Sequence, residues 1–327
     1  MNGPADAVSG KRVLVTGGAG FIGSHLVDVL SGLGPAALVV ADSFFLGRRE
    51  NLISASGKYP DLAVEEVDAA DMEAIEGLVA RHRPDVVFDL ATIPLPYSLE
   101  HPYPTVQANV SLALNLAELA RRGEYETLVH VSSSEVYGTA VTVPMTESHP
   151  ITPLTPYAAS KAAADHVVSS YVATFGIDAT IVRPFNNYGP RQNEGSYAGL
   201  IPLVIRAALG GEAVTVFGDG SQTRDFLYVT DTAGAIVAAF AARDTRGKTL
   251  NIASGIETSV NEVVATIFEV LDLPARVEHQ PGRPGDVARH CGDSSAAAKA
   301  FGFTPTVSVR SGIERTVEWY RAHAGGA

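Results

Sequence analysis

The feature that most constrains the fold is a glycine-rich segment near the start of the chain. Residues 17–23 read Gly-Gly-Ala-Gly-Phe-Ile-Gly, between a β-rich run, Arg12–Thr16, and a stretch with helical apolar spacing, Phe21–Leu33. In such a strand–turn–helix unit the first glycine permits a tight turn, the second lets the backbone approach a pyrophosphate, and the third allows close packing of helix on strand. The helix N-terminus presents free N–H groups to the phosphates. The predicted dinucleotide-binding residues are Gly17, Gly20, Phe21, Ile22 and Gly23.

Strand-like and helix-like segments alternate through the first half of the chain. Predicted strands are Arg12–Thr16, Leu38–Ala41, Leu62–Val67, Asp85–Leu90, Thr127–Val131 and Ile177–Arg183, and predicted helices are Phe21–Leu33, Met72–Arg83, Thr105–Arg122 and Pro156–Phe175. Continuous apolar strands that alternate with helices indicate an α/β fold with a doubly wound parallel sheet, a Rossmann fold.

The alternation breaks after about residue 184, where Pro, Gly and Asn cluster over Arg183–Gly195. Helices are still expected at Val260–Leu271 and Val309–His323. We therefore expect a Rossmann domain over residues 11–183 and a smaller, irregular substrate-binding lobe over residues 184–323, with some exchange of chain between them.

The acidic residue after the second predicted strand bears on the cofactor. Asp42 can accept hydrogen bonds from both ribose hydroxyls and would repel a 2′-phosphate, which favours NAD. Arg48 and Arg49 follow soon after, so NADP stays open. Asp68, at the end of the third predicted strand, is a candidate partner of the adenine or a solvated strand-end charge.

Two later segments carry candidate catalytic groups. Tyr157 and Lys161 are spaced i and i+4 in the first turns of a predicted helix, so they share one face, and an ammonium beside a phenol is expected to lower the phenol pKa. Such a tyrosine can take a proton from a sugar hydroxyl, although an ordinary exposed pair has the same spacing. Ser133 and Glu135 follow the fifth predicted strand, where a hydroxyl can bridge substrate and phenol and a carboxylate can serve as a second acid/base.

Composition excludes several classes of protein. The formal net charge of −12 argues against nucleic-acid binding, which needs a basic face. A single cysteine, Cys291, gives no disulfide framework and no clustered metal ligands, so no metal site is predicted. The first ten residues lack the pattern of a signal peptide, and no apolar stretch reaches membrane-spanning length, so a cytoplasmic location and no membrane partner are expected.

Taken in order, these motifs resemble the extended short-chain dehydrogenase/reductases, the NAD-dependent nucleotide-sugar epimerase, dehydratase and decarboxylase family. The resemblance runs from about Lys11 to Tyr320, through GGAGFIGSHL at 17–26, DLAT at 89–92, SSSEVYG at 132–138, PYAASK at 156–161, RPFNNYGPRQ at 183–192, RDFLYVTD at 224–231 and RPGD at 283–286. It implies a catalytic set of Ser133, Glu135, Tyr157 and Lys161, with Lys161 also on the ribose. It also implies a nucleotide-sugar substrate held by Pro94, Tyr97, Asn187, Arg191, Arg224 and Arg283. His290 stands near a position where the decarboxylases usually carry an arginine, and it is either a further substrate residue or a packed side chain.

The resemblance also ranks the reactions, all of which pass through a 4-keto sugar. Ser134-Glu135 and the Pro94–Tyr97 segment are similar to UDP-glucuronate decarboxylases, which would give UDP-xylose, a UDP-4-keto-pentose, or both. A hexose 4,6-dehydratase is the second alternative, a 4-epimerase the third, and a non-catalytic NAD-binding sensor the alternative of another class.

The resemblance further implies a homodimer, in which the helices at 105–122 and 156–175 pair with their copies in a four-helix interface. Apolar residues such as Val167, Val168 and Tyr171 fit such an interface. Helices that cover the sheet within one monomer would show the same apolar faces.

Overall fold

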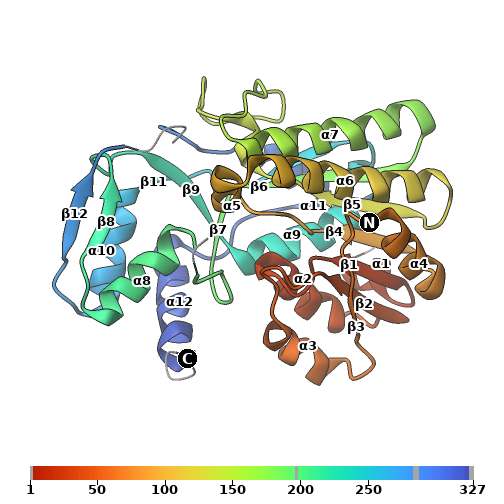
Figure 1. The fold of residues 1–327 in the computed structure, drawn as a ribbon, viewed down its shortest axis with the longest axis horizontal. Helices are drawn as coiled ribbons and strands as arrows, with labels where there is room; N and C mark the ends of the chain where they lie inside the picture. The colour runs from red at the N-terminus through yellow and green to blue at the C-terminus, as the bar shows by residue number, and fades with distance from the viewer. Residues whose placement is uncertain (1–2, 196–197, 283–286, 324–327) are drawn as a thin grey trace.

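The structure is a computed structural model that describes residues 3–195, 198–282 and 287–323. It has a larger lobe built around a seven-stranded sheet and a smaller lobe that lies beside it (Figure 1).

The central sheet of the larger lobe is parallel throughout, in the order β10-β6-β5-β4-β1-β2-β3. Its strands are β1 (Arg12–Thr16), β2 (Ala37–Asp42), β3 (Ala63–Glu66), β4 (Val86–Asp89), β5 (Thr127–Val131), β6 (Asp178–Pro184) and β10 (Thr249–Ile252). The strand order reverses between β1 and β4, and ligands of such sheets bind at the carboxyl ends of the strands beside that point. The doubly wound parallel sheet predicted from the sequence is therefore confirmed.

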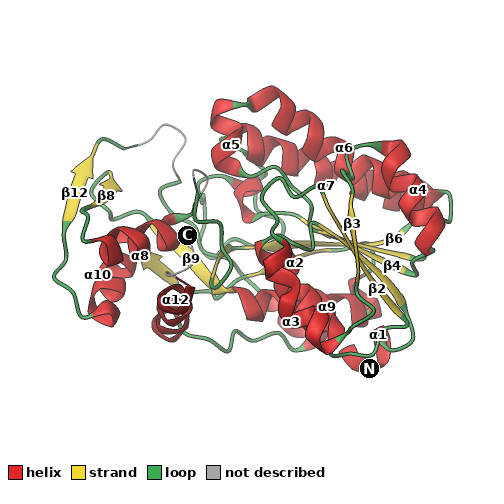
Figure 2. Ribbon diagram, turned by 60° about the horizontal axis from the view of Figure 1, so that its bottom comes forward, coloured by secondary structure: helices red, strands yellow, loops and turns green. Residues whose placement is uncertain are grey.

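Helices cover both faces of this sheet (Figure 2). One face packs against α1 (Pro4–Val8), α2 (Phe21–Ser31), α3 (Ile53–Lys58), α9 (Val229–Ala241) and α11 (Ser295–Phe301). The other packs against α4 (Met72–His82), α6 (Pro102–Arg121) and α7 (Pro156–Phe175), of which α6 and α7 lie side by side. Both faces are apolar, which explains why the sheet strands read as continuous hydrophobic runs.

The smaller lobe has its own apolar core and two small sheets, β11-β9-β7 and β12-β8. Its elements are β7 (Asn186–Tyr188), α8 (Leu200–Gly210), β8 (Val214–Phe217), β9 (Thr223–Tyr228), β11 (Glu257–Ser259), α10 (Val260–Leu271), β12 (Val277–Gln280) and α12 (Val309–His323). Short helices α5 (Leu95–Glu100), η1 (Arg49–Leu52), η2 (Ser134–Tyr137) and η3 (Arg243–Thr245) lie in connecting segments.

The lobes are not contiguous in sequence. After β9 the chain returns to the larger lobe, where α9 packs on α2 and β10 pairs with β6 as the edge strand of the main sheet. Residue 184 therefore marks the first passage between the lobes and not a single boundary. The structure also differs locally from the prediction, because α6 begins at Pro102 instead of Thr105 and Pro94–Tyr97 leads into the helical turn α5.

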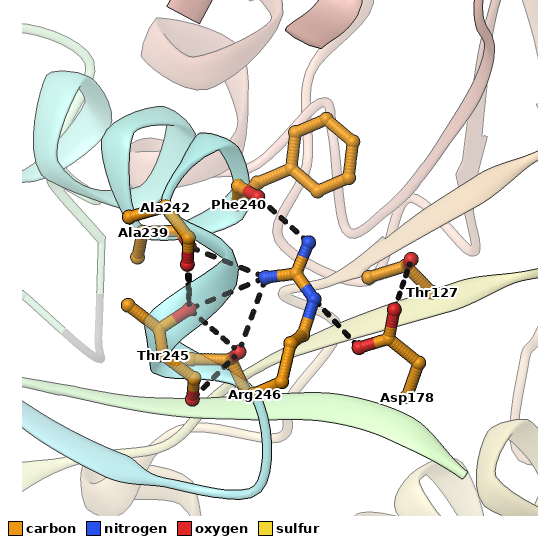
Figure 3. Close-up of polar contacts among 8 residues, drawn as sticks. Thr127, Asp178, Ala239, Phe240, Ala242, Thr245 and Arg246 are labelled. Carbon is orange, nitrogen blue, oxygen red and sulfur yellow. Dashed lines mark hydrogen bonds and ion pairs between the residues drawn. The ribbon is translucent and has the colours of Figure 1, made fainter. Parts of the chain in front are cut away.

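Arg246, which follows α9, connects the returning segment to the main sheet by polar contacts (Figure 3). The Nε of Arg246 lies 2.6 Å from Oδ1 of Asp178 at the start of β6, and its Nη2 donates to the carbonyl of Phe240 at 2.7 Å, in the last turn of α9. Asp178 also accepts the hydroxyl of Thr127 from β5 at 3.1 Å. Side-chain donors that satisfy the last carbonyls of a helix stabilise its C-terminus, so this contact fixes α9 against β5 and β6.

Candidate active site

A cavity of about 570 Å³ opens at the carboxyl ends of β1 and β4, over the glycine turn. Gly17 has φ +66°, and a Cβ there would lie 2.6 Å from the main-chain nitrogen of Ala91. A Cβ on Gly23 would lie 2.1 Å from the carbonyl oxygen of Gly17, so α2 packs directly onto the turn. The predicted residues that line this cavity are Gly17, Gly20, Phe21, Ile22, Gly23, Asp42, Asp68, Pro94, Tyr157, Lys161 and Arg191.

Asp42 is buried at the edge of this cavity. Its two carboxylate oxygens accept the main-chain N–H groups of Ala19 at 2.9 Å and of Phe44 at 2.8 Å. Burial raises the pKa of Asp42, against these main-chain hydrogen bonds. Asp68 is exposed, and its Oδ1 accepts the N–H of Ala70 at 2.9 Å. Asp42 is thus fixed in orientation with acceptor capacity left over, because an ionised carboxylate offers about four lone-pair sites.

Tyr157 and Lys161 both line the cavity, on the same side of α7. The Nζ of Lys161 is buried and donates to the carbonyl of Val131 at 2.9 Å. Burial lowers the pKa of Lys161, and the carboxylates of Asp89 and Asp165 oppose that shift.

The pKa of Tyr157 moves in the opposite direction to the one predicted. Burial is the largest of several influences, which together raise the pKa of Tyr157 to about 12. The carboxylates of Glu135 and Asp165 act in the same direction as burial, and hydrogen bonds with Ser133 and Thr92 oppose it. The sequence argument rested on the neighbouring ammonium and a bound nicotinamide, whereas in the protein alone desolvation of the phenolate is the largest influence on its pKa. Without a bound cofactor the phenol of Tyr157 is therefore protonated, and it is hydrogen-bonded to the hydroxyl groups of Ser133 and Thr92.

A row of buried polar side chains crosses the sheet beneath Lys161. The Nδ1 of His130 lies 2.7 Å from Oδ2 of Asp89, and its Nε2 lies 3.6 Å from Oδ1 of Asp165. The Nε of Arg183 donates to Oδ2 of Asp165 at 2.8 Å, and its Nη1 donates to the hydroxyl of Tyr137 at 2.8 Å. The carboxylates of Asp89 and Asp165 are therefore held close enough to act electrostatically on Lys161, and they favour its charged form.

Ser133 immediately precedes the short η2 helix that follows β5, and Glu135 lies within this helix. The hydroxyl of Ser133 accepts the N–H of Glu135 at 3.2 Å, as the N-cap of η2. Glu135 lines a second cavity, of about 660 Å³, between the lobes. The carboxylate of Glu135 acts electrostatically on the phenol of Tyr157, which lines the first cavity, and the two cavities share Gln192 and Gly199 in their walls.

The predicted substrate residues are distributed unevenly around this second cavity. Asn187 and Arg224 line it, and the amide of Asn187 donates to the carbonyl of Phe185 at 2.6 Å. Pro94 and Arg191 line the first cavity instead, and Arg191 pairs with Asp28 at 2.7 Å. Arg283 lies outside the described residues.

Three predicted residues, Ser133, Tyr97 and His290, are not among the residues that line either cavity. The ring of Tyr97 packs edge-on against Phe45, with ring centres 5.0 Å apart, and Tyr97 is not among the lining residues of either cavity. His290 is fully buried behind the wall, with Nε2 3.1 Å from the carbonyl of Ser134 and Nδ1 3.3 Å from Oδ1 of Asn186. Burial lowers the pKa of His290 to about 4, so the neutral ring supports the Ser134-Glu135 turn and does not face the cavities.

Several residues of the site were not among those predicted from the sequence. Thr92 contacts the phenol, Asn109 binds the main chain of Ile93 at 2.7 Å, and Gln192 lines both cavities. Trp319 reaches the first cavity from the last helix of the smaller lobe. Thr92 and Gln192 are the last residues of the DLAT and RPFNNYGPRQ motifs, whereas nothing near Trp319 in the sequence points to the cavity.

No helix of the described residues has the length and apolarity needed to cross a membrane. Over the same residues no group of three or more His, Cys, Asp or Glu side chains is arranged to hold a metal ion.

Comparisons with known proteins agree with this geometry. A family model described as GDP-mannose 4,6 dehydratase matches residues 14–316. The chain belongs to the extended short-chain dehydrogenase/reductases, in the nucleotide-sugar epimerase/dehydratase family.

Members of this epimerase/dehydratase family that resemble the chain differ in reaction. It is 38% identical to a UDP-glucose 4-epimerase of Mycolicibacterium smegmatis, covering 95% of this chain and 98% of the relative. It is 36% identical to a dTDP-glucose 4,6-dehydratase of Actinoplanes, with the same coverage, and 34% identical to a UDP-N-acetyl-alpha-D-glucosaminuronate decarboxylase of Bacillus cytotoxicus, again over 95% and 98%.

Solved structures of the epimerase/dehydratase family superpose closely. A dTDP-glucose 4,6-dehydratase of Streptomyces venezuelae with NAD bound gives a TM-score of 0.89 at 34% identity, covering 96% of this chain and 98% of that one. A UDP-glucose 4-epimerase of Thermotoga maritima with UDP-glucose gives 0.89 at 31% identity, over 95% and 99%. The likeness supports an NAD-dependent enzyme that modifies nucleotide sugars, and leaves the choice of reaction to the site.

Proposed function

We propose that the chain is an NAD-dependent nucleotide-sugar 4,6-dehydratase. The observation that carries this proposal is the position of Glu135, whose carboxylate lines the substrate cavity and acts electrostatically on the Tyr157 phenol. Oxidation at C4 needs only Tyr157 with its serine and lysine partners, whereas loss of water from C5 and C6 needs a second acid/base.

The glycine turn fits NAD. The main-chain N–H groups at the start of α2 would bind the diphosphate, Asp42 the adenosine ribose and Lys161 the nicotinamide ribose. The hydroxyl of Ser132 is buried at this cavity, and no partner is found for it among the described residues, so it is a further donor for the cofactor. When bound, NAD would supply a hydride acceptor for oxidation at C4 and, once reduced, a hydride donor for C6.

The protein groups would then divide the proton transfers. Tyr157 takes the proton of the C4 hydroxyl as C4 is oxidised to a ketone, and Ser133 hydrogen-bonds the same oxygen. The new ketone makes the C5 hydrogen acidic, and Glu135 removes that proton. Glu135 would pass this proton to the departing C6 hydroxyl, which leaves as water. A hydride delivered to C6 and a proton from solvent at C5 would then give the 4-keto-6-deoxy sugar, and Tyr157 would return its proton to solvent. The phenol pKa of about 12 has to fall for the first step, and the positive charge of bound NAD acts in that direction.

The UDP-glucuronate decarboxylase that ranked first on sequence becomes the second candidate. The Ser134-Glu135 pair and the Bacillus cytotoxicus relative favour it. The substrate of a decarboxylase carries a carboxylate at C6 in addition to the diphosphate. Among the described residues that line the substrate cavity, Arg224 is the one basic side chain for both anionic groups. Arg289, next to His290, instead pairs with Glu257 at the surface, with Nε 3.0 Å from Oε1. A 4-epimerase would leave Glu135 without a chemical role.

A substrate panel separates these reactions. The protein is incubated with UDP-glucose, dTDP-glucose, GDP-mannose and UDP-glucuronate, and the products are weighed by mass spectrometry. Loss of water from a hexose supports the proposal. Loss of carbon dioxide from UDP-glucuronate alone would establish the decarboxylase instead, and a product of unchanged mass with altered retention would establish the epimerase.

Glu135→Gln tests the carboxylate itself. The variant should still exchange the C4 hydrogen with the cofactor but release no dehydrated sugar, since only the C5 proton transfer is lost. Ser148→Ala, at an exposed hydroxyl outside both cavities, serves as the control. A Glu135→Gln protein that dehydrates at the wild-type rate would refute the assignment of Glu135.

We also propose a homodimer formed by α6 and α7. Val106 and Leu114 of α6 are 37% and 40% exposed, and Val167 and Tyr171 of α7 are half-buried. Val168, included in this face on sequence grounds, is instead fully buried against the sheet. Leu114→Arg should convert a dimer to a monomer in light scattering, and a wild-type monomer would refute the interface.

A further inference from the structure

The last helix of the smaller lobe reaches the dinucleotide cavity. Trp319, on α12, lines that cavity together with the glycine turn at Gly17–Gly23 and the catalytic Lys161. Both views place α12 on the side of the smaller lobe that faces α2 (Figures 1 and 2). A residue about 300 positions from the glycine turn therefore forms part of its binding site.

The position of Trp319 is fixed by its own helix. Ile313, Val317 and Tyr320 are buried in the core of the smaller lobe, which anchors the inner face of α12. The imidazole of His323 stacks on the indole at 4.4 Å between ring centres. The indole packs on His323 and partly on the core of the smaller lobe, and it also lines the cavity, so little conformational freedom is lost when it contacts a ligand.

The surroundings of Trp319 show which part of the cavity it covers. The N–H of Arg48 and the side-chain amide of Asn51 both donate to the carbonyl of Ala19 in the glycine turn, at 3.1 Å and 2.8 Å. Arg48 lines the same cavity and acts electrostatically on Tyr320, the neighbour of Trp319. The end of α12 and the Arg48–Asn51 segment, which is hydrogen-bonded to the glycine turn, therefore border the same cavity.

A loop from the smaller lobe closes the same region. Arg191 pairs with Asp28 of α2 at 2.7 Å, and the side chain of Gln192, which lines both cavities, donates to the carbonyl of Asn187 at 3.2 Å. The hydroxyl of Tyr320 lies 3.5 Å from the carbonyl of Gln192. Helix α12, this loop and α2 thus surround one cavity.

Provided that NAD is the cofactor, as proposed above, we propose that Trp319 retains the dinucleotide by covering it from the smaller lobe. Retention has a chemical reason, because the proposed reaction removes a hydride from C4 and returns it at C6. A cofactor released between these steps would leave the keto sugar stranded. A rigid aromatic ring over the bound dinucleotide excludes water and slows dissociation without entering the chemistry.

The inference can be tested by fluorescence, because Trp319 is the only tryptophan in the sequence. Addition of NADH to the wild-type protein should quench the tryptophan emission and sensitise the emission of NADH by energy transfer. Displacement of NADH by excess NAD in a stopped-flow instrument then gives the release rate.

Three variants make the measurement decisive. Trp319→Ala should release NADH roughly tenfold faster or more, since the ring that covers it is gone. Trp319→Phe should lose the energy transfer but keep a rate near that of the wild type, because a ring is still present. Glu318→Ala, at an exposed position on the same helix, is the matched control and should keep both the energy transfer and the rate.

The outcomes separate the retention role from the proposed function. If dialysis detects no NADH or NAD on the wild-type protein, NAD dependence fails and the retention role fails with it. If the wild type binds NADH but shows no energy transfer, or if Trp319→Ala releases NADH within about twofold of the wild-type rate, only the role of Trp319 is refuted. A Trp319→Phe protein that releases NADH as fast as Trp319→Ala would also refute coverage by a ring.

Discussion

Asp165→Asn should destabilise the protein strongly even though it changes almost no volume. The side chain of Asp165 is 2% exposed, and its carboxylate pairs with the buried guanidinium of Arg183 at 2.8 Å. Its other oxygen lies 3.6 Å from the ring of His130. The amide removes the negative charge and leaves Arg183 buried beside a neutral group.

The size of the effect follows from the burial. Breaking a buried ion pair by removing one partner costs about 3–5 kcal/mol. Unfolding entropy is about 2.1 cal/mol/K per residue, which for 327 residues is about 0.7 kcal/mol/K. Dividing the first quantity by the second predicts that Tm falls by about 4–7 °C.

Differential scanning calorimetry measures this shift, and Asp178→Asn is the matched control. Asp178 makes the same type of contact with Arg246, at 2.6 Å, but its side chain is 44% exposed (Figure 3). Exposed pairs contribute about 0–1 kcal/mol, so the control should lose less than about 2 °C. If Asp165→Asn melts within about 1 °C of the wild type, or no lower than Asp178→Asn, the reasoning from the buried pair is refuted.

Two further predictions concern the reaction and the dependence of stability on pH. Tyr157→Phe should lower turnover by about 10²–10⁴-fold while dialysis still detects bound NAD, and unchanged turnover would remove Tyr157 from the mechanism. His290 takes up a proton at an ordinary pKa of 6.5 when unfolded but only at about 4 when folded, so its contribution to stability is present near neutral pH and is lost as pH falls through that window. The contribution of His290 to the free energy of unfolding, measured with urea, should therefore drop by about 3 kcal/mol between about pH 7 and pH 4. His290→Gln should make this decline shallower. Part of the decline that is left in the variant comes from His25, whose pKa is also lowered to about 4. An unchanged pH dependence in His290→Gln would contradict the assignment.

The sequence revealed those parts of the site that are local. The glycine turn, Asp42 and the Tyr157–Lys161 pair each depend on a few neighbouring residues and on the strand or helix that carries them, so their spacing was sufficient. The first six strands of the main sheet were found for the same reason, because each is an apolar run bounded by turn residues.

Features that depend on distant residues could not be predicted. Strand β10 is a four-residue run, Thr249–Ile252, and nothing in it shows that it pairs with β6. The pKa of Tyr157 is governed by desolvation, which no spacing reports. His290 was assigned from a motif position, yet burial among side chains from other segments places it behind the wall of the cavity.

The return of β10 to the main sheet has a consequence for how the protein is made and engineered. During synthesis the edge of that sheet stays open until residues well beyond the first elements of the smaller lobe have left the ribosome, so the two lobes reach their final form together. A fragment that ends at residue 184 would expose the unpaired edge of β6 and the apolar face that α9 covers, and should aggregate. Exchange of substrate specificity between relatives would therefore require replacing several separate segments at once, because no single crossover transfers the smaller lobe intact.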